Sequence, residues 1–115
     1  MSKDLAGWLN YAHVRMILVR MPKLLSETDI KSRLTSLKGW KREKSFITKT
    51  FEFDSFMSGI RFVDKLAEIA EEKEHHPDIH LRYTKIKLSI QTHSAGGVTG
   101  KDFDLAAAID QIQIR

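Results

Sequence analysis

Two histidines stand side by side in EHHPDIHLRY, residues 74–83, in a chain of 115 residues that has five histidines in all. Imidazole titrates near neutrality, so one ring can accept a proton while a neighbouring ring donates one. His75 and His76 are therefore candidates for acid-base catalysis, and His93 is predicted to enter the same pocket from a strand. Glu71, four residues before His75, would share its helix face and orient a ring or bind an N–H edge of a ligand.

Each of these residues also has a purely structural interpretation. His75 could be a helix C-terminal residue favoured by the macrodipole, and His76 and Pro77 could form only a turn. Asp102 is interpreted as the capping-box carboxylate of a last helix, and Tyr83 as a strand aromatic that packs beside the site. Taken singly, each histidine is more often structural than catalytic, so the interpretation depends on the whole set.

Metal binding ranks below acid-base chemistry. Several His and Glu residues could ligate zinc, but the sequence contains neither HExxH nor another fixed multi-ligand spacing. His13 and His80 have no partners at a recognisable spacing and are interpreted as structural. The chain has no cysteine, which excludes disulfides and thiol chemistry and is typical of a reducing compartment.

The formal net charge of +4 is concentrated near the N-terminus. Residues 1–23 carry +3, from Lys3, Arg15, Arg20 and Lys23 against Asp4, and this leaves +1 for residues 24–115. A basic stripe on the folded body is not indicated, so direct nucleic-acid binding is not expected.

Residues 1–23 are interpreted as an N-terminal appendage. Arg15 and Arg20 interrupt its apolar run, which is too short to span a bilayer, so no membrane association is expected. The acid-poor segment with spaced arginines fits an organelle transit peptide, a short packed element, or a leader before a second start at Met21. The protein is expected to be cytoplasmic, with organelle targeting through residues 1–23 as the alternative.

Residues 24–115 are predicted to form one domain. Ser26 and Asp29 match a capping box that begins a helix, and Gly39 ends the run. Residues 40–53 predict a hairpin around the polar stretch KREKS. Asp54 is predicted to cap a long core helix, whose apolar stripe is expected from Phe56, Ile60, Val63, Ala67 and Ala70, widened by Phe62, Leu66 and Ile69.

Pro77 disfavours the helical region for the preceding residue, which places His75 and His76 at or just past the last turn of this helix. HLRY and TKIKLSIQTH predict two more strands, and the alternation in the second puts His93 on its wet face. Thr99 and Asp102 predict the capping box of a final helix that contains Leu105, Ile109 and Ile112.

The resulting order, α-β-β-α-β-β-α, predicts an α+β two-layer sandwich. Adjacent strand pairs joined by short turns give a four-stranded antiparallel sheet, with the helices packed on one face. The other face and the sheet edges would remain open. A homo-oligomer, dimer or tetramer, is therefore expected.

The chain as a whole resembles a known family. The run of Glu71, His75, His76, Pro77, Tyr83, His93 and Asp102 resembles the signature of the pterin-4a-carbinolamine dehydratases, also known as the dimerisation cofactor family. LKGW at 37–40, FEFDSFMSGIRFVDKLAEIAEE through the long helix and FDLAAAID near the end are similar as well. The resemblance covers residues 24–115.

This resemblance implies dehydration of a 4a-hydroxytetrahydropterin, the product left by aromatic amino acid hydroxylases, to quinonoid dihydropterin and water. The catalytic set would be His75, His76 and His93, with His76 and His93 nearest the departing hydroxyl. Glu71, Glu74 and Thr92 would orient the pterin, although family members often carry Asp in place of Glu74. Pro77, Tyr83 and Asp102 would support the site. The pterin is the substrate, and the family needs neither a metal nor a redox cofactor.

The resemblance also implies an alternative function as a protein-binding module. Some relatives stabilise dimers of a homeodomain transcription factor, and others are organelle assembly factors, in some cases with degraded active-site motifs. All three motif histidines are present in this chain, which favours the enzyme. Retained histidines do not exclude a second role with a protein partner.

Overall fold

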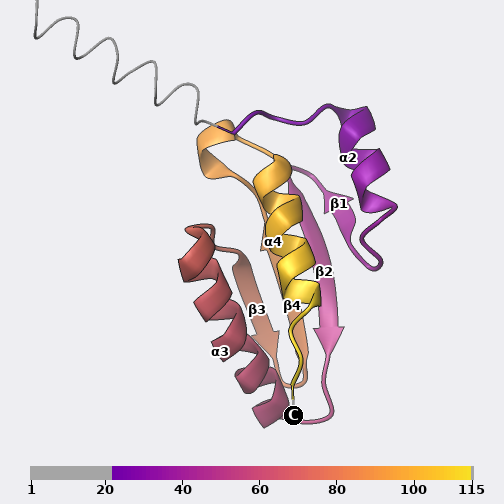
Figure 1. Cartoon of the computed structure of the whole chain (residues 1–115). Helices are drawn as coiled ribbons and strands as arrows, with labels where there is room; N and C mark the ends of the chain where they lie inside the picture. The colour runs from indigo at the N-terminus through magenta and orange to yellow at the C-terminus, as the bar shows by residue number, and fades with distance from the viewer. Residues whose placement is uncertain (1–21, 115) are drawn as a thin grey trace, which may run out of the picture.

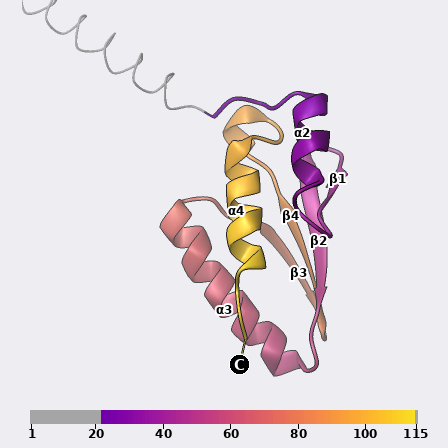
Figure 2. The same ribbon diagram turned by 45° about the vertical axis from the view of Figure 1, so that its right-hand side comes forward.

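The computed structural model describes residues 22–114. In this range a four-stranded antiparallel sheet, in the order β1-β2-β4-β3, is covered on one face by helices (Figures 1 and 2). The elements are α2 (Glu27–Leu34), β1 (Lys41–Glu43), β2 (Phe46–Glu52), α3 (Phe56–Lys73), β3 (Asp78–Arg82), β4 (Lys85–Ile90), the 3₁₀ turn η1 (His93–Ala95) and α4 (Gly100–Asp110). The predicted fold class and element order are confirmed, with η1 added. Except for Pro22 and Lys23, the predicted appendage lies outside the described residues.

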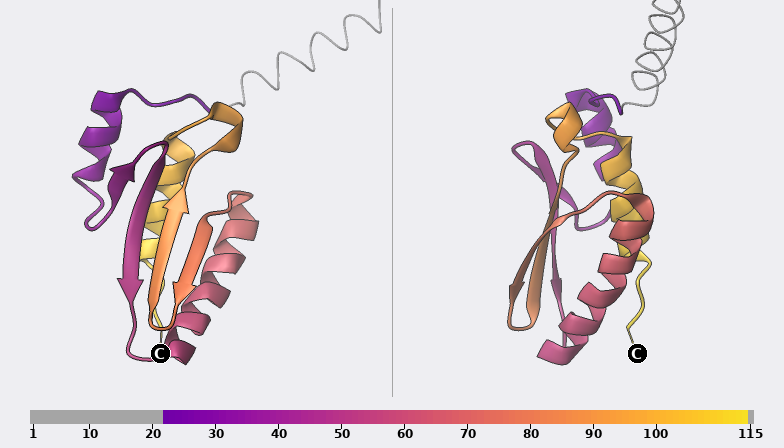
Figure 3. Two further views of the ribbon diagram at one scale, coloured as in Figure 1. Left: turned by 180° about the vertical axis from the view of Figure 1, so that it is seen from behind. Right: turned by 90° about the vertical axis from the view of Figure 1, so that its left-hand side faces the viewer.

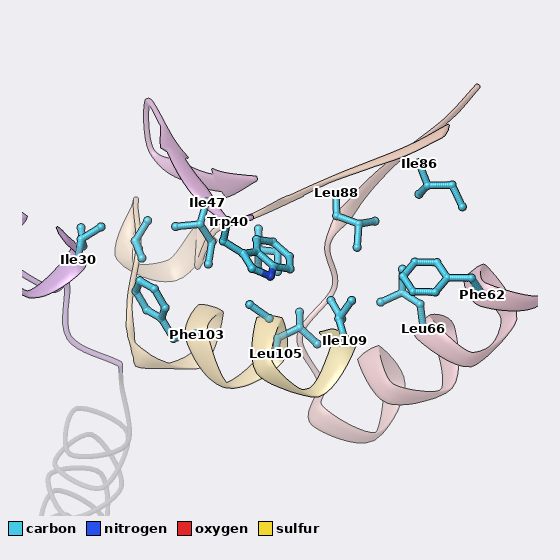
Figure 4. Packing of buried hydrophobic residues seen from close by; sticks show 13 residues of the cluster. Ile30, Trp40, Ile47, Phe62, Leu66, Ile86, Leu88, Phe103, Leu105 and Ile109 are labelled. Atoms are coloured by element: carbon cyan, nitrogen blue, oxygen red, sulfur yellow. The ribbon is translucent and has the colours of Figure 1, made fainter. Parts of the chain in front are cut away.

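The core lies between the sheet and the two longer helices, α3 and α4. Alternate residues of the strands face these helices, because successive side chains of a strand point to opposite faces. Ile86, Leu88 and Ile90 of β4 are fully buried in this layer, as is Ile47 of β2. The sheet residues meet apolar side chains of α3 and α4, including Phe62, Leu66, Leu105 and Ile109 (Figure 4).

The buried face of α3 is rotated from the predicted stripe. Its buried residues are Gly59, Phe62, Leu66 and Ala70, whereas Phe56, the first residue of the predicted stripe, is exposed. Gly59 faces the sheet, and a Cβ there would make an ordinary contact with Ile86 Cδ1 at 3.4 Å. Phe62, Leu66 and Ala70 were among the predicted residues, whereas Gly59 was missed because a glycine carries no apolar signal.

The start of α3 and the first hairpin also differ from prediction. Ser55, not Asp54, is the N-cap of α3, and its hydroxyl accepts a hydrogen bond from the backbone N–H of Ser58 at 3.1 Å. β1 lies inside the stretch predicted as the turn, and only Lys44 and Ser45 separate the strands, with Lys44 at φ +56°. Polar residues form β1 because it is a short, exposed edge strand.

A polar contact fixes the C-terminal end of α4 against the first hairpin. The Trp40 indole N–H donates to Asp110 Oδ2 at 3.0 Å, and the Lys49 ammonium donates to Asp110 Oδ1 at 2.9 Å. Lys49 also lies 4.8 Å from the centre of the Phe51 ring, which adds a cation–π contact. Because α4 is held at this end, its N-terminus keeps a fixed place beside the end of β4.

Truncation of the buried α3 face tests this packing. Leu66 is 0% exposed, so Leu66→Ala should lower the free energy of unfolding by about 2–5 kcal/mol through lost burial and a residual cavity. Denaturant unfolding measures this loss. The matched control is Leu24→Ala, the same substitution at an exposed leucine, which should lower the free energy of unfolding by less than about 0.5 kcal/mol. A change on α3 itself, such as Ala67→Gly, would not serve as a control, because glycine destabilises a helix. Equal losses in Leu66→Ala and Leu24→Ala would contradict the assigned face.

Candidate functional site

The chain reverses direction at the C-terminal end of α3 through a left-handed residue. Glu74 caps the helix with φ +51° and ψ +40°, and its backbone N–H donates to the carbonyls of Ala70 and Glu71. The next N–H, from His75, also donates to the carbonyl of Ala70, at 3.0 Å. His75 and His76 therefore lie just past the last helical turn, as predicted, and Pro77 follows them into β3.

His75 is held by a buried carboxylate. Its Nε2 lies 2.6 Å from Oδ1 of Asp102, which is 0% exposed. A carboxylate only accepts hydrogen bonds, so Nε2 carries the proton and Nδ1 is left as the acceptor nitrogen. Within the described residues, no buried side-chain nitrogen or oxygen lacks a hydrogen-bond partner, so the unpaired Nδ1 remains accessible to solvent.

Asp102 serves two purposes at once. Its other oxygen, Oδ2, accepts from the backbone N–H of Thr99 at 2.8 Å, which is the predicted capping box of α4. The same oxygen accepts from the Thr92 hydroxyl at 2.9 Å. The residue pattern predicted only the capping role, whereas the family resemblance implied that Asp102 also supports the site. The contact with His75 joins residues 27 positions apart in the sequence, which local patterns do not reveal.

Thr92 reaches Asp102 because the chain after β4 folds back on itself. The Thr92 N–H donates to the carbonyl of Gly97 at 2.9 Å, and the Thr92 carbonyl accepts from Ala95 and Gly96. Gly96 makes the tight reversal with φ +73°. The hydroxyl of Thr92 is shared between Asp102 and Thr99. All polar groups of Thr92 are thus engaged within the protein, which favours a positioning role over a direct contact with substrate.

His76 pairs with Glu71. Its Nε2 lies 2.5 Å from Glu71 Oε2, and both side chains are exposed. The prediction that Glu71 shares a face with His75 is wrong, because the left-handed Glu74 breaks the helical periodicity between positions 71 and 75. The carboxylate instead orients the second imidazole of the pair.

His93 comes from η1, the turn after β4, and not from the strand itself as predicted. Strand pairing ends at Ile90, and the following bridge between Thr92 and Gly97 turns the chain. The ring is exposed, and Gln91 Nε2 lies 3.2 Å from its Nδ1. An amide NH₂ donates to that nitrogen, so the neutral ring carries its proton on Nε2.

The three imidazoles meet at a hollow of about 340 Å³. Glu74, Pro77 and Thr92 line it with them, so these predicted site residues are brought together. Glu71 contacts His76 from outside this lining, and Asp102 lies buried beneath His75. Four lining residues were missed by sequence reasoning, namely Asp78, Gln91, Ser94 and Lys101. Gln91 could have been predicted, because it lies two residues before His93 and on the same face of the predicted strand.

Tyr83 does not belong to this site. It lies in the β3–β4 turn with φ +52° and is 75% exposed. The length of β3 separates it from His75 and His76, and five strand residues span about 13–17 Å. The prediction that it packs beside the site is wrong, because the strand ends at Arg82 and the aromatic ring is carried into the turn.

The groups around the hollow are imidazoles, carboxylates, hydroxyls, an amide and one ammonium. Within residues 22–114, no three or more His, Asp and Glu side chains are grouped so that they could hold a metal ion. None of the helices in the same range is long and apolar enough to cross a bilayer.

Comparison with known proteins identifies the family. The family model described as pterin 4 alpha carbinolamine dehydratase matches residues 23–112. This chain belongs to that family. A protein of Roseiflexus castenholzii, provisionally named pterin-4-alpha-carbinolamine dehydratase, is 53% identical over 92 residues that cover 80% of this chain and 99% of the relative. A protein of Sulfolobus acidocaldarius with the same provisional name is 46% identical over 89 residues, which cover 77% of this chain and 98% of the relative. The resemblance seen in the sequence is confirmed.

Solved structures share the fold. A protein from Brucella melitensis described as a transcriptional coactivator/pterin dehydratase aligns with a TM-score of 0.72 and 31% identity, over 75% of this chain and 94% of that one. A pterin dehydratase-like protein, described as a RuBisCO assembly factor in the alpha-carboxysome, aligns with a TM-score of 0.55 and 25% identity. The alignment covers 63% of this chain and 86% of that one. The family fold therefore occurs in proteins with different described roles.

The buried network can be tested by Asp102→Asn. The amide can still accept a hydrogen bond, but it removes the charge that His75 and Thr92 share, so unfolding free energy should fall by about 1.5–3 kcal/mol. The control is Asp104→Asn, an exposed neighbour on α4, expected to change stability by less than about 0.5 kcal/mol. Nitrogen NMR of His75 should also show loss of the single Nε2–H tautomer. An unchanged tautomer and equal stability of the two variants would refute the network.

Proposed function

We propose that this protein dehydrates 4a-hydroxytetrahydropterin to quinonoid dihydropterin and water, and so recycles the pterin cofactor of aromatic amino acid hydroxylases. The observation that carries the proposal is the meeting of three imidazoles at one hollow, with one of them held by a buried carboxylate. Membership of the dehydratase family supports the substrate class.

The reaction needs one acid and one base. The C4a–O bond breaks and its electron pair leaves with the hydroxyl, which takes a proton to become water. The N5–H bond gives up its proton, and its electrons form the C4a=N5 double bond. One proton is donated and one is accepted, so the chemistry is balanced by two imidazoles in opposite protonation states.

The contacts of the rings suggest how these roles are divided. His93 can act as the acid in its imidazolium form, whose Nε2–H protonates the departing hydroxyl while the Gln91 amide beside Nδ1 turns its oxygen toward Nδ1–H. His75 presents Nδ1 as an acceptor while Nε2–H faces Asp102. If His75 takes the N5 proton, the carboxylate stabilises the imidazolium that forms, as a buried aspartate does in other His–Asp pairs.

His76 and the acidic residues would then hold the pterin. His76 is oriented by Glu71 on the exposed side of the hollow, where its Nδ1 can contact the hydroxyl of the substrate. Glu74 and Asp78 line the hollow and could accept hydrogen bonds from the N–H groups of the pyrimidine edge. Thr92 acts through Asp102, as a positioning residue for His75.

The first test is the rate of 4a-hydroxytetrahydropterin loss, followed by absorbance. Wild type should accelerate the reaction well above the uncatalysed rate, and His75→Ala/His76→Ala should lose about 10²–10⁴-fold, the usual contribution of acid-base catalysis. The control Glu72→Ala/Lys73→Ala changes two exposed residues at the same end of α3 and should keep the wild-type rate. A wild-type rate equal to the uncatalysed one would overturn the proposal.

A homo-oligomer is part of the proposal, and β3 supports it. In the described chain β3 pairs with β4 alone, and its five residues are exposed. Ile79 and Leu81 point toward the core side but remain 39% and 37% exposed at this edge. An open, partly apolar edge strand is a template for pairing with another chain.

Substitution at this edge tests the assembly. Leu81→Lys should convert the wild-type oligomer to a smaller species in sedimentation, because a charge would be buried where two edges meet. Leu24→Lys, at an exposed leucine outside the sheet, should leave the mass unchanged. A monomeric wild type, or an oligomer that tolerates Leu81→Lys, would exclude this edge as the interface.

A protein-binding role remains the second candidate function. The solved relatives are described as a transcriptional coactivator/pterin dehydratase and as an assembly factor, so related chains are associated with protein partners. A partner that binds elsewhere on the surface would leave the hollow at the histidines free for the dehydratase reaction. Both functions can therefore belong to one molecule.

A further inference from the structure

The face of the sheet opposite the helices is uncovered in the described chain (Figure 3). The strand register places alternate residues on this face, because Ile86 and Leu88 of β4 point to the core and their neighbours point away. Lys85 lies beside Arg82 of β3 on this open face, and Lys87 lies beside His80.

Two like charges are adjacent on this part of the sheet. Arg82 and Lys85 are directly opposite each other across β3 and β4, and like charges in that position are destabilising. Within residues 22–114, neither side chain forms an ion pair. Lys87 is paired with Glu43 at 3.1 Å, and this hydrogen bond and charge lower the pKa of Glu43. Arg82 and Lys85 are therefore adjacent cations, and the carboxylate nearest to them in the strand register is Glu52 of β2, opposite Lys85 on its other side.

These side chains surround a hollow of about 400 Å³, called here the cationic hollow. It is lined by Thr50, His80, Arg82, Lys85, Lys87 and Ser89, and no acidic residue is among them. A second hollow at the β3–β4 turn shares Arg82 and Lys85 and adds the exposed ring of Tyr83. The surface thus offers cations, hydroxyl groups and one aromatic ring to a ligand.

We propose that the cationic hollow binds an extended acidic segment of a partner protein. Its basic side chains lie in two rows, Arg82 with Lys85 and His80 with Lys87, and the rows are two residues apart along each strand. Lys87 also pairs with Glu43. The separation of the rows is about 6.6–6.8 Å, which matches the spacing of carboxylates on alternate residues of an extended peptide. Carboxylates placed on this repeat can meet one row each.

A peptide fits this surface better than a nucleic acid does. Glu43, Glu52 and Asp78 lie on the same open face around the hollow, so a phosphate backbone that crossed the sheet would meet carboxylates. The positive patch is short, and a short acidic segment can end before these residues. Arg82 lies about 13 Å along β3 from Asp78, which lines the histidine hollow, so this binding is separate from dehydration.

The test uses the full ¹⁵N-labelled chain and two synthetic peptides of the same composition. In one, glutamate alternates with serine, and in the other the glutamates are consecutive. The alternating peptide should bind more tightly and shift the amide resonances of β3 and β4. Arg82→Gln/Lys85→Gln should weaken its binding by about tenfold or more, since two charge-assisted contacts are lost. Lys31→Gln/Lys38→Gln, with the same change in charge at exposed residues outside the sheet, should keep the affinity.

Folding of the variants is checked independently by their melting temperatures and amide spectra. Removal of the Arg82 and Lys85 charges should leave the melting temperature close to that of wild type, because the lost Arg82–Lys85 repulsion offsets the lost Glu52–Lys85 attraction. If the two peptides bind with equal affinity, or if both double variants weaken binding equally, the affinity depends on net charge alone and the proposal is overturned. Tighter binding of a single-stranded oligonucleotide at the same resonances would also overturn it.

Discussion

The buried carboxylate of Asp102 is the constraint on which the site depends. A charge with no solvent exposure is costly unless it is paired and hydrogen-bonded. Here three donors satisfy it: the imidazole of His75, the hydroxyl of Thr92 and the backbone N–H of Thr99. These donors come from the end of α3, the end of β4 and the start of α4. The same contacts that satisfy the charge therefore hold these three chain ends in one place.

This arrangement gives the histidines different degrees of freedom. His75 is buried and bound to a carboxylate, whereas His76 and His93 are exposed and held by single contacts to Glu71 and Gln91. A catalytic base benefits from a fixed orientation. Side chains that contact the substrate as it enters and leaves must be accessible from solvent. The site thus combines one rigid ring with two accessible rings around a shared hollow.

Much of the fold follows from the sequence, because its signals are local. The alternation of β4, the proline after His76 and the capping pair Thr99–Asp102 each depend on residues within a few positions of one another. Two of the errors arose where one residue breaks a period. Glu74 adopts a left-handed conformation, so Glu71 contacts His76 and not His75. Gly59 lies on the core face of α3 although it has no apolar side chain. The pairing of His75 with Asp102 is non-local, so no periodic pattern contains it.

The proposed catalytic site and the proposed binding surface lie at different places on the sheet. The histidine hollow is built at one end, where α3, η1 and α4 converge, and its geometry is set by Asp102. The cationic hollow lies toward the other end, on the face that no described helix covers. The proposed acid-base chemistry at the first hollow places no demand on Arg82 or Lys85, which face each other across β3 and β4 with Glu52 on the other side of Lys85. The proposed acidic segment would supply carboxylates to a cationic pair that meets a carboxylate of the described chain only on its Glu52 side.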